Sequence, residues 1–141
     1  MDHNDLLTLL ARVTPQYVAG FFDGEGCVYA HLGGTQARRH PGVWVSLSQN
    51  DVTPLALIAI KYPGCAGPTP SKSTFTLVWS GRNCIPILEA IQDFVIVKKT
   101  QVDAGIELAK LMGDHGERPH QSNLDKRREF ATIIKDAKIM T

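Results

Sequence analysis

One stretch constrains this chain more than any other: residues 17–26 read YVAGFFDGEG. An apolar segment with small residues, typical of a helix, runs directly into two acids, Asp23 and Glu25, that alternate with glycines. Gly24 and Gly26 are predicted to end the helix, because glycine readily adopts positive φ. The C-terminus of a helix carries partial negative charge, so acids placed there need a cation to offset them. Since carboxylate and carbonyl oxygens are the ligands that hard divalent cations prefer, the stretch predicts a metal site.

Other interpretations of the stretch are weaker, but one remains open. The residues also fit an amphipathic helix that ends at a glycine and carries two solvated acids. A calcium loop is not supported, because the later acidic positions and the closing glutamate are missing. A dinucleotide-binding loop is not supported either, because those glycines follow a strand and these follow a helix.

The segment from Val18 to Gly26 resembles, over nine unbroken positions, the signature of the LAGLIDADG homing endonucleases, here in the form V-A-G-F-F-D-G-E-G. The resemblance implies an α+β fold with an αββαββα core, whose curved antiparallel sheet has helices on one face and lies over the DNA major groove. It also implies a site-specific endonuclease that hydrolyses one phosphodiester on each strand of double-stranded DNA. The implied cofactor is Mg²⁺ or Mn²⁺, with about two or three ions per dimer.

Hydrophobic periodicity predicts the order of the elements along the chain. Helices are predicted at about residues 5–11, 15–23, 51–62, 83–94 and 98–112, and from Ser122 to about 140. Strands are predicted at about 27–31, 43–48 and 73–80, with a short strand and loop between 63 and 70. Hairpins separated by helices favour an antiparallel sheet with helices on one face. We expect one domain over residues 1–141, with a core at about 12–112 and a C-terminal helical extension at about 120–140.

Several details of the helices follow from the same patterns. Ser122 is predicted to cap the last helix, and Ile60 is expected to face the core together with Leu55, Leu57 and Ile58. The basic run from Lys126 to Arg128 is interpreted as a solvated helix face, with contact to phosphate left open.

Composition limits the classes of protein. No apolar run approaches the length of about 18 residues that a membrane span needs. The N-terminus has no signal or transit character, so we expect an intracellular protein that is not secreted, in a prokaryotic cytoplasm or an organelle that makes its own proteins. Three cysteines without CxxC spacing favour reduced structural thiols over zinc sites or disulfides.

The charge distribution favours nucleic acid as a partner, although the net charge is only +1. Between residues 27 and 82 there are five basic residues and one acid, Asp51, whereas the rest of the chain is slightly acidic. The strand-rich region is therefore expected to be the positive face that meets DNA.

The chain carries one such signature, and the resemblance implies a homodimer in which two signature helices pack together. The predicted interface residues are Tyr17, Ala19, Gly20, Asp23 and Gly24. Small residues on a helix can instead serve packing within one protomer, and this alternative stays open.

The resemblance also implies site residues. Glu25, the second acid, is the expected catalytic metal ligand, assisted by the carbonyl of Gly24, and Asp23 is expected to hydrogen-bond at the helix end. Gln49, at the end of a strand, is a candidate for positioning water, with a purely structural role equally open. Lys98 lies in a segment similar to the F-x-x-x-K-x-x-Q of the family and is a catalytic candidate that orients water or stabilises phosphate charge.

Candidates for DNA contact are expected on the polar face of the predicted sheet, because alternate side chains of a two-stranded ribbon meet base edges in the major groove. They are Tyr29, His31, Gln36, Arg38, Arg39, His40, Trp44, Ser46, Lys72, Thr74 and Thr76. For each of them, the role of an ordinary solvated strand residue is equally open. A dimer of this kind implies a long, partly palindromic target. The alternative function is that of a non-cleaving relative that binds nucleic acid, such as a maturase with intron RNA as its partner.

Overall fold

The computed structural model describes residues 2–33, 40–113 and 119–140, apart from the side chain of Met140. Helices and strands alternate in the order that the sequence predicts, with one added 3-10 turn, η1. The elements are α1 (His3–Arg12), α2 (Pro15–Glu25), β1 (Gly26–His31), β2 (Gly42–Gln49), α3 (Val52–Lys61), β3 (Ala66–Ser71), β4 (Thr74–Ser80), η1 (Gly81–Asn83), α4 (Cys84–Ile91), α5 (Lys99–Leu111) and α6 (Gln121–Met140).

The four strands form one antiparallel sheet in the order β1-β2-β4-β3. Gly26 pairs with Leu47 and His31 with Gly42, so β1 and β2 run side by side over the whole length of β1. Burial alternates along β1 and β2 as the period-two pattern predicts. Val45 and Leu47 are on the buried face, whereas Trp44 and Ser46 are on the half-exposed face.

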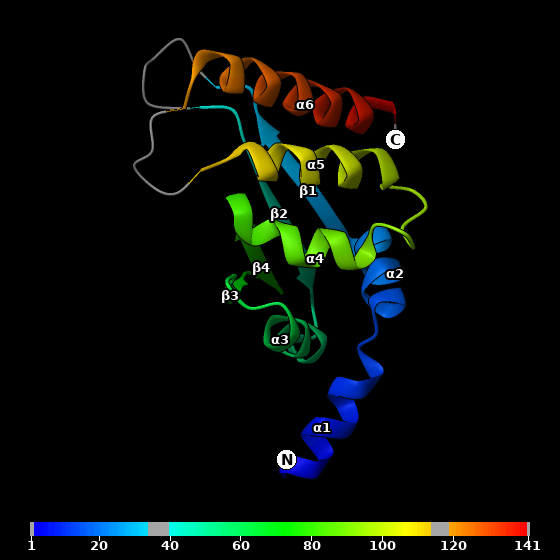
Figure 1. The fold of residues 1–141 in the computed structure, drawn as a ribbon. Helices are drawn as coiled ribbons and strands as arrows, with labels where there is room; N and C mark the ends of the chain where they lie inside the picture. Colours follow the sequence, from blue (N-terminus) through cyan, green and yellow to red (C-terminus); the bar gives the residue numbers. More distant parts are fainter. Residues whose placement is uncertain (1, 34–39, 114–118, 141) are drawn as a thin grey trace.

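Helices cover the buried face of this sheet, as expected. Figure 1 shows α4 and α5 crossing it, with α3 below and α2 beside the start of β1. The core between these layers is apolar, and its largest fully buried side chains include Trp79, Phe22 and Leu47. Trp79 donates its indole N–H to the carbonyl of Tyr62 at 2.8 Å, so this buried polar group is satisfied. The predicted α+β architecture is confirmed.

The first and last helices flank the layer of helices on the sheet, and α6 adds Ala131 and Ile134 to the core. α1 projects from the body at the N-terminal end (Figure 1). α6 packs along α5 and β1 and thereby covers the β1 edge of the sheet. None of the helices within the described ranges has the length and apolar character needed to span a membrane.

The end of the signature helix differs from the prediction. α2 continues to Glu25, and neither Gly24 nor Gly26 adopts positive φ; Gly26 is extended, with φ of −92°. The prediction that glycine ends this helix through positive φ is therefore wrong. Gly26 is needed for space instead, because a Cβ there would lie 2.5 Å from a carbon of the Phe22 ring.

Two predictions about other helices are also wrong. Ile60 is 53% exposed, because it occupies the outer face of α3 near its end, whereas Leu55 and Ile58 are fully buried. Ser122 does not cap α6, which begins one residue earlier. His120 takes that place, with its carbonyl accepting from the N–H of Leu124 and its ring nitrogen Nδ1 lying 3.4 Å from the N–H of Ser122.

Candidate functional site

Glu25 is the last residue of α2 and the point at which the helix joins β1. Its side chain is exposed, and no described residue donates a hydrogen bond to its carboxylate. Gly24, also exposed, lies in the last helical turn, where no further turn donates N–H groups to the backbone carbonyls. A carboxylate and a carbonyl are thus presented together at one surface position.

Asp23 has the structural role expected for it. Its two carboxylate oxygens accept the backbone N–H groups of Ile96, at 2.7 Å, and of Lys98, at 3.1 Å. These bonds attach the end of α2 to the segment between α4 and α5, more than 70 residues away along the chain. Because both oxygens are engaged in this way, Asp23 is not a free ligand for a metal ion.

Lys98 supplies the cation that the end of α2 requires. Its Nζ donates to the carbonyls of Phe22 and Asp23, at 3.1 Å each, and to the carbonyl of Gly26. These three acceptors bracket Gly24 and Glu25 in the sequence and use all three donors of the ammonium group. The positive charge offsets the partial negative charge of the helix C-terminus. Lys98 therefore fixes the backbone that carries Glu25.

Gln49 is brought to the same end of the sheet. Leu47 is opposite Gly26, so Gln49, two residues further along β2, lies beyond the start of β1 on the helix-covered side. Its Oε1 accepts the N–H of Asn50 at 2.8 Å, whereas its amide NH₂ has no hydrogen-bond partner among the described residues. The structure thus brings together Glu25, Gly24, Lys98 and Gln49.

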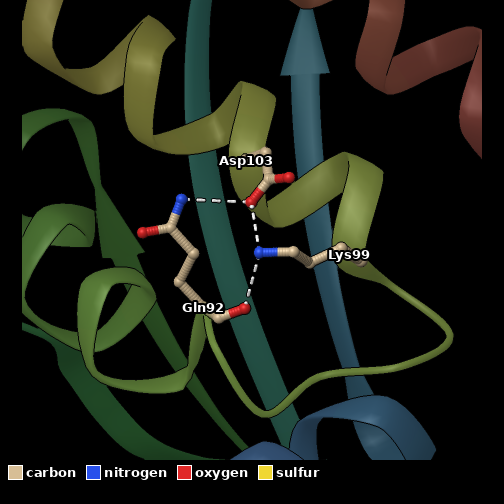
Figure 2. Close-up of polar contacts among 3 residues, drawn as sticks. All are labelled: Gln92, Lys99 and Asp103. Carbon is tan, nitrogen blue, oxygen red and sulfur yellow. Dashed lines mark hydrogen bonds and ion pairs between the residues drawn. The ribbon is translucent and has the colours of Figure 1, made fainter.

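The neighbouring lysine serves a different purpose. Lys99 Nζ bonds the carbonyl of Gln92 at 2.8 Å and the carboxylate of Asp103 at 3.0 Å, and the Gln92 amide also donates to Asp103 (Figure 2). This exposed network joins the end of α4 to the first turns of α5. It supports the segment that carries Lys98 without contacting α2.

The residues of α2 that are predicted to form a dimer interface differ in their burial within the protomer. A Cβ on Gly20 or on Gly24 would meet no atom within 4 Å, so this stripe of α2 is bare within the protomer, and Tyr17 beside it is exposed. Ala19 is different, because it is 1% exposed and belongs to the protomer core. Its prediction as an interface residue is corrected: here the small residue serves packing within the chain.

The half-exposed face of the sheet carries stacked rings. Tyr29 and Trp44 are opposite each other on β1 and β2, with ring centroids 5.5 Å apart and planes 18° apart. The ring centroids of His31 and Trp44 are also 5.5 Å apart. Nζ of Lys138, from α6, lies 4.1 Å from the centroid of the Tyr29 ring. The pKa of Tyr29 is raised, first by a hydrogen bond with the Cys27 side chain, then by the charge of Cys27 and by burial.

The other candidates for DNA contact are mostly on this face. Ser46 and Thr76 are half-buried there, and the Thr76 hydroxyl is 3.0 Å from that of Ser48 across the strands. Thr74 begins β4, and Lys72 is exposed in the turn before it, with a positive φ of 50°. His40 is exposed just before β2. Gln36, Arg38 and Arg39 lie outside the described residues.

Three basic residues of α6 that contact this region were not identified as site candidates. Arg127 is 6% exposed, so the interpretation of residues 126–128 as a solvated face is wrong for it. Its Nε donates to the carbonyl of Pro41 at 2.8 Å, Nε of Arg128 donates to that of Leu32 at 3.2 Å, and Lys138 covers Tyr29. No local pattern marks these contacts, which join residues far apart in the sequence.

Comparison with solved structures decides the fold family. The homing endonuclease I-CvuI, solved in complex with a DNA target in the presence of Mg, superimposes with a TM-score of 0.70 at 16% identity, covering 90% of this chain and 81% of its own. An archaeal intron-encoded enzyme, I-Vdi141I complexed with DNA, gives 0.68 at 21% identity over 87% of this chain and 82% of its own. The chain has the LAGLIDADG homing endonuclease fold.

A further LAGLIDADG-fold neighbour, I-TnaI, gives a TM-score of 0.67 at 18% identity and covers 90% of this chain and 95% of its own. No family model and no curated protein matches the sequence. The resemblance seen in residues 18–26 is thus confirmed by the three-dimensional fold.

Proposed function

We propose that this protein is a homodimeric, site-specific endonuclease that hydrolyses one phosphodiester on each strand of double-stranded DNA with a divalent metal ion. The observation that carries the proposal is the end of α2, where an exposed Glu25 carboxylate follows Gly24 and Lys98 holds the carbonyls on either side. The fold supports it, because the similar structures I-CvuI and I-Vdi141I are homing endonucleases in complex with DNA.

The donor atoms fit Mg²⁺ or Mn²⁺. Glu25 offers a free carboxylate and Gly24 a terminal carbonyl, and Mg²⁺ takes one or two carboxylates and completes its shell with waters and phosphate oxygens. Within the described ranges of one protomer, no three His, Cys, Asp or Glu side chains gather into a metal site. In the proposed dimer, the partner's Glu25, DNA phosphate oxygens and waters would complete the ligand set. A bound ion would activate water and stabilise the leaving oxygen.

A symmetric dimer through α2 would bring the two Glu25 carboxylates close to its twofold axis. The bare stripe at Gly20 and Gly24 permits close approach of two helix backbones. Exposed apolar side chains lie beside it, since Ile96, whose N–H bonds Asp23, is 83% exposed and the adjacent Val97 is 58% exposed. Burial of these side chains against a second copy would stabilise the dimer.

Lys98 and Gln49 support the reaction from fixed positions. Lys98 places its ammonium group against the backbone on either side of Glu25, near the position where negative charge would develop on the phosphate during hydrolysis. The unpaired amide NH₂ of Gln49 is available to orient a water molecule at the same end of the sheet.

The half-exposed sheet face is the proposed DNA-binding surface. A two-stranded ribbon such as β1–β2 fits the major groove, where side chains meet base edges. The dimer repeats this surface by twofold symmetry, so the target is expected to be long and partly palindromic.

The test is cleavage of a randomised double-stranded DNA library with Mg²⁺, comparing wild type with Glu25→Gln and with Glu89→Gln, a matched control on the exposed face of α4. We expect wild type and Glu89→Gln to cut one long site. Glu25→Gln should lose at least about 10³-fold in cleavage rate, because the carboxylate that holds the metal ion is gone. Binding, measured in Ca²⁺, should persist in all three proteins.

Two results would contradict the proposal. Equal cleavage by Glu25→Gln would remove Glu25 from the site. Salt-sensitive binding by wild type without cleavage would favour a non-cleaving nucleic-acid-binding protein, such as a maturase that acts on intron RNA. Sedimentation of the unliganded protein tests the dimer separately.

A further inference from the structure

We propose that Arg127 and Arg128 of α6 are positioning residues for target recognition, which fix the loop end of the β1–β2 hairpin. This inference rests on the proposed function, since it concerns how the hairpin reads DNA. The hairpin end is defined here by Leu32, which follows β1, and Pro41, which precedes β2.

The two arginines reach both sides of the hairpin end. Nε of Arg127 donates to the carbonyl of Pro41 at 2.8 Å, and Nε of Arg128 donates to the carbonyl of Leu32 at 3.2 Å. The last pair of the β1–β2 ladder, His31 with Gly42, lies between these carbonyls and the rest of the sheet. Two adjacent residues of α6 therefore hold the segment that follows β1 and the segment that precedes β2, immediately beyond the ladder.

The position of Arg127 argues for this role and against phosphate binding. Arginine is rarely buried unless it is paired, and Arg127 is 6% exposed within the protomer. Its guanidinium is directed at a buried backbone carbonyl rather than at solvent. The surroundings are tightly packed, because a Cβ on Gly42 would lie 3.0 Å from the ring of His31.

α6 is itself attached near both of its ends, so it can serve as a fixed support. The Asn123 amide donates to the carbonyl of Leu111, the last residue of α5, at 3.0 Å. Near the other end, Lys138 lies against the Tyr29 ring on the proposed DNA-binding face. Figure 1 shows α6 running alongside α5, and α6 also contacts β1.

Recognition should depend on this support. His31, the last residue of β1, and His40, the exposed residue directly before Pro41, are both candidates for DNA contact at this hairpin end. Bidentate base contacts require a side chain to be held within a fraction of an ångström of its productive position. Loosening the hairpin end should therefore weaken discrimination at the base pairs that this hairpin reads, while leaving the Glu25 site at the opposite end of β1 intact.

The experiment is selection from a randomised double-stranded DNA library in Ca²⁺, followed by sequencing of the bound fraction. Wild type is compared with Arg128→Gln and with Lys126→Gln, which removes the same charge from an exposed position of the same helix. Arg127→Lys provides a second test that keeps the charge. Thermal denaturation shows whether each variant is folded, and because Arg128 is exposed its replacement is expected to leave the fold intact.

We expect Arg128→Gln and Arg127→Lys to lose about tenfold in discrimination at base pairs away from the centre of the target, a loss comparable to that of one mismatch. The central pairs should keep their preference. The slope of log affinity against log salt should stay that of wild type, because no phosphate contact is removed.

Three results would overturn the inference. Position-by-position preferences of Arg128→Gln that match wild type would show that the hairpin end needs no support. A salt slope reduced by about one, together with a uniform loss across sequences, would identify Arg128 as a phosphate contact instead. Failure of wild type itself to select any sequence would overturn both this inference and the proposed function. Failure of this inference alone is distinguishable, because wild type would then still select a sequence.

Discussion

The two ends of β1 are built in different ways. At the Gly26 end, nine consecutive residues supply the helix terminus, the free carboxylate and the glycines, and Lys98 is the main addition from elsewhere. At the His31 end, the chain is held by Arg127 and Arg128, which come from a helix about 90 residues further along. The first end is a continuous sequence pattern, whereas the second is assembled by tertiary contacts.

The difference suggests a division of labour. Chemistry on a phosphate needs the same few atoms in every target, so a short fixed pattern can supply them. Under the proposed function, recognition of a particular sequence would depend on base contacts from the hairpin, whose position can change through residues remote from the DNA. The predictions below test whether the two ends are indeed independent, beginning with the largest expected effect.

Replacing Lys98 should disrupt the backbone at the Gly26 end of β1, where α2 ends. In Lys98→Met three helix-end carbonyls lose their cation, and we expect cleavage to fall by about 10²-fold or more and the protein to melt at lower temperature. Lys99→Met is the matched control, because the contacts of Lys99 among the described residues are the exposed ones of Figure 2, which should contribute less than about 1 kcal/mol. Single-turnover cleavage and thermal denaturation of both variants provide the measurement.

If both lysine variants cleave equally, the charge of Lys98 is not needed at the site. Base preference at the His31 end should be unchanged in Lys98→Met. A changed preference would show that the two ends are coupled.

At the His31 end, the two arginines should differ in their contribution to stability. Arg127→Met leaves the buried Pro41 carbonyl without its donor and removes packing, so we expect a loss of about 2–3 kcal/mol in the free energy of unfolding. Arg128→Met removes an exposed hydrogen bond, so the free energy of unfolding should fall by less than about 1 kcal/mol. Urea denaturation measures both. Equal losses would mean that burial of Arg127 is not the cause.

Much of the fold could be predicted from the sequence. Val43, Val45 and Leu47 recur at every second position and form a strand, and Asp51, at the start of a predicted helix, caps α3. These elements follow from local periodicity and capping, which are properties of a few neighbouring residues. The candidate site could be predicted for the same reason, because Glu25 and Gly24 are adjacent in the chain.

The remaining features depend on packing partners that a local pattern does not reveal. Arg127 looks like a solvated residue in a basic run until β1 and β2 are placed against α6. Ala19 looks like a small interface residue until Val18 and Phe22 are seen to share its buried face. The role of Gly26 depends on the position of the Phe22 ring rather than on backbone φ.

The substitution Gly20→Ala tests whether the bare stripe of α2, near the Gly26 end of β1, forms the dimer interface. Because a Cβ at Gly20 meets no atom within 4 Å, Gly20→Ala should stabilise the protomer by up to about 1 kcal/mol through helix propensity. It should weaken the dimer, raising the dissociation constant by about tenfold, since the added methyl group separates two close backbones. Sedimentation over a dilution series measures this constant. Gly105→Ala is the control, because its Cβ would meet Leu88 at 3.2 Å inside the protomer and should leave dimerisation unchanged.

The smallest expected effect concerns the buried thiol of Cys84, just beyond β4. Burial raises the pKa of Cys84 from its ordinary value of 9.0 to about 12, so the folded protein keeps a proton that the unfolded chain releases. This stabilising contribution is complete below pH 9 and is lost as the pH rises toward 12. Between pH 8 and about pH 9.5, the free energy of unfolding, measured by urea denaturation, should thus fall by up to about 1 kcal/mol more in wild type than in Cys84→Ala.

The raised pKa values of Tyr29 and Tyr62 act in the same direction in both proteins, so a difference between wild type and Cys84→Ala isolates the thiol. Parallel pH profiles would mean that the core next to β4 admits solvent, and the contrast between a packed His31 end and an open Gly26 end would then be weaker than the structure indicates.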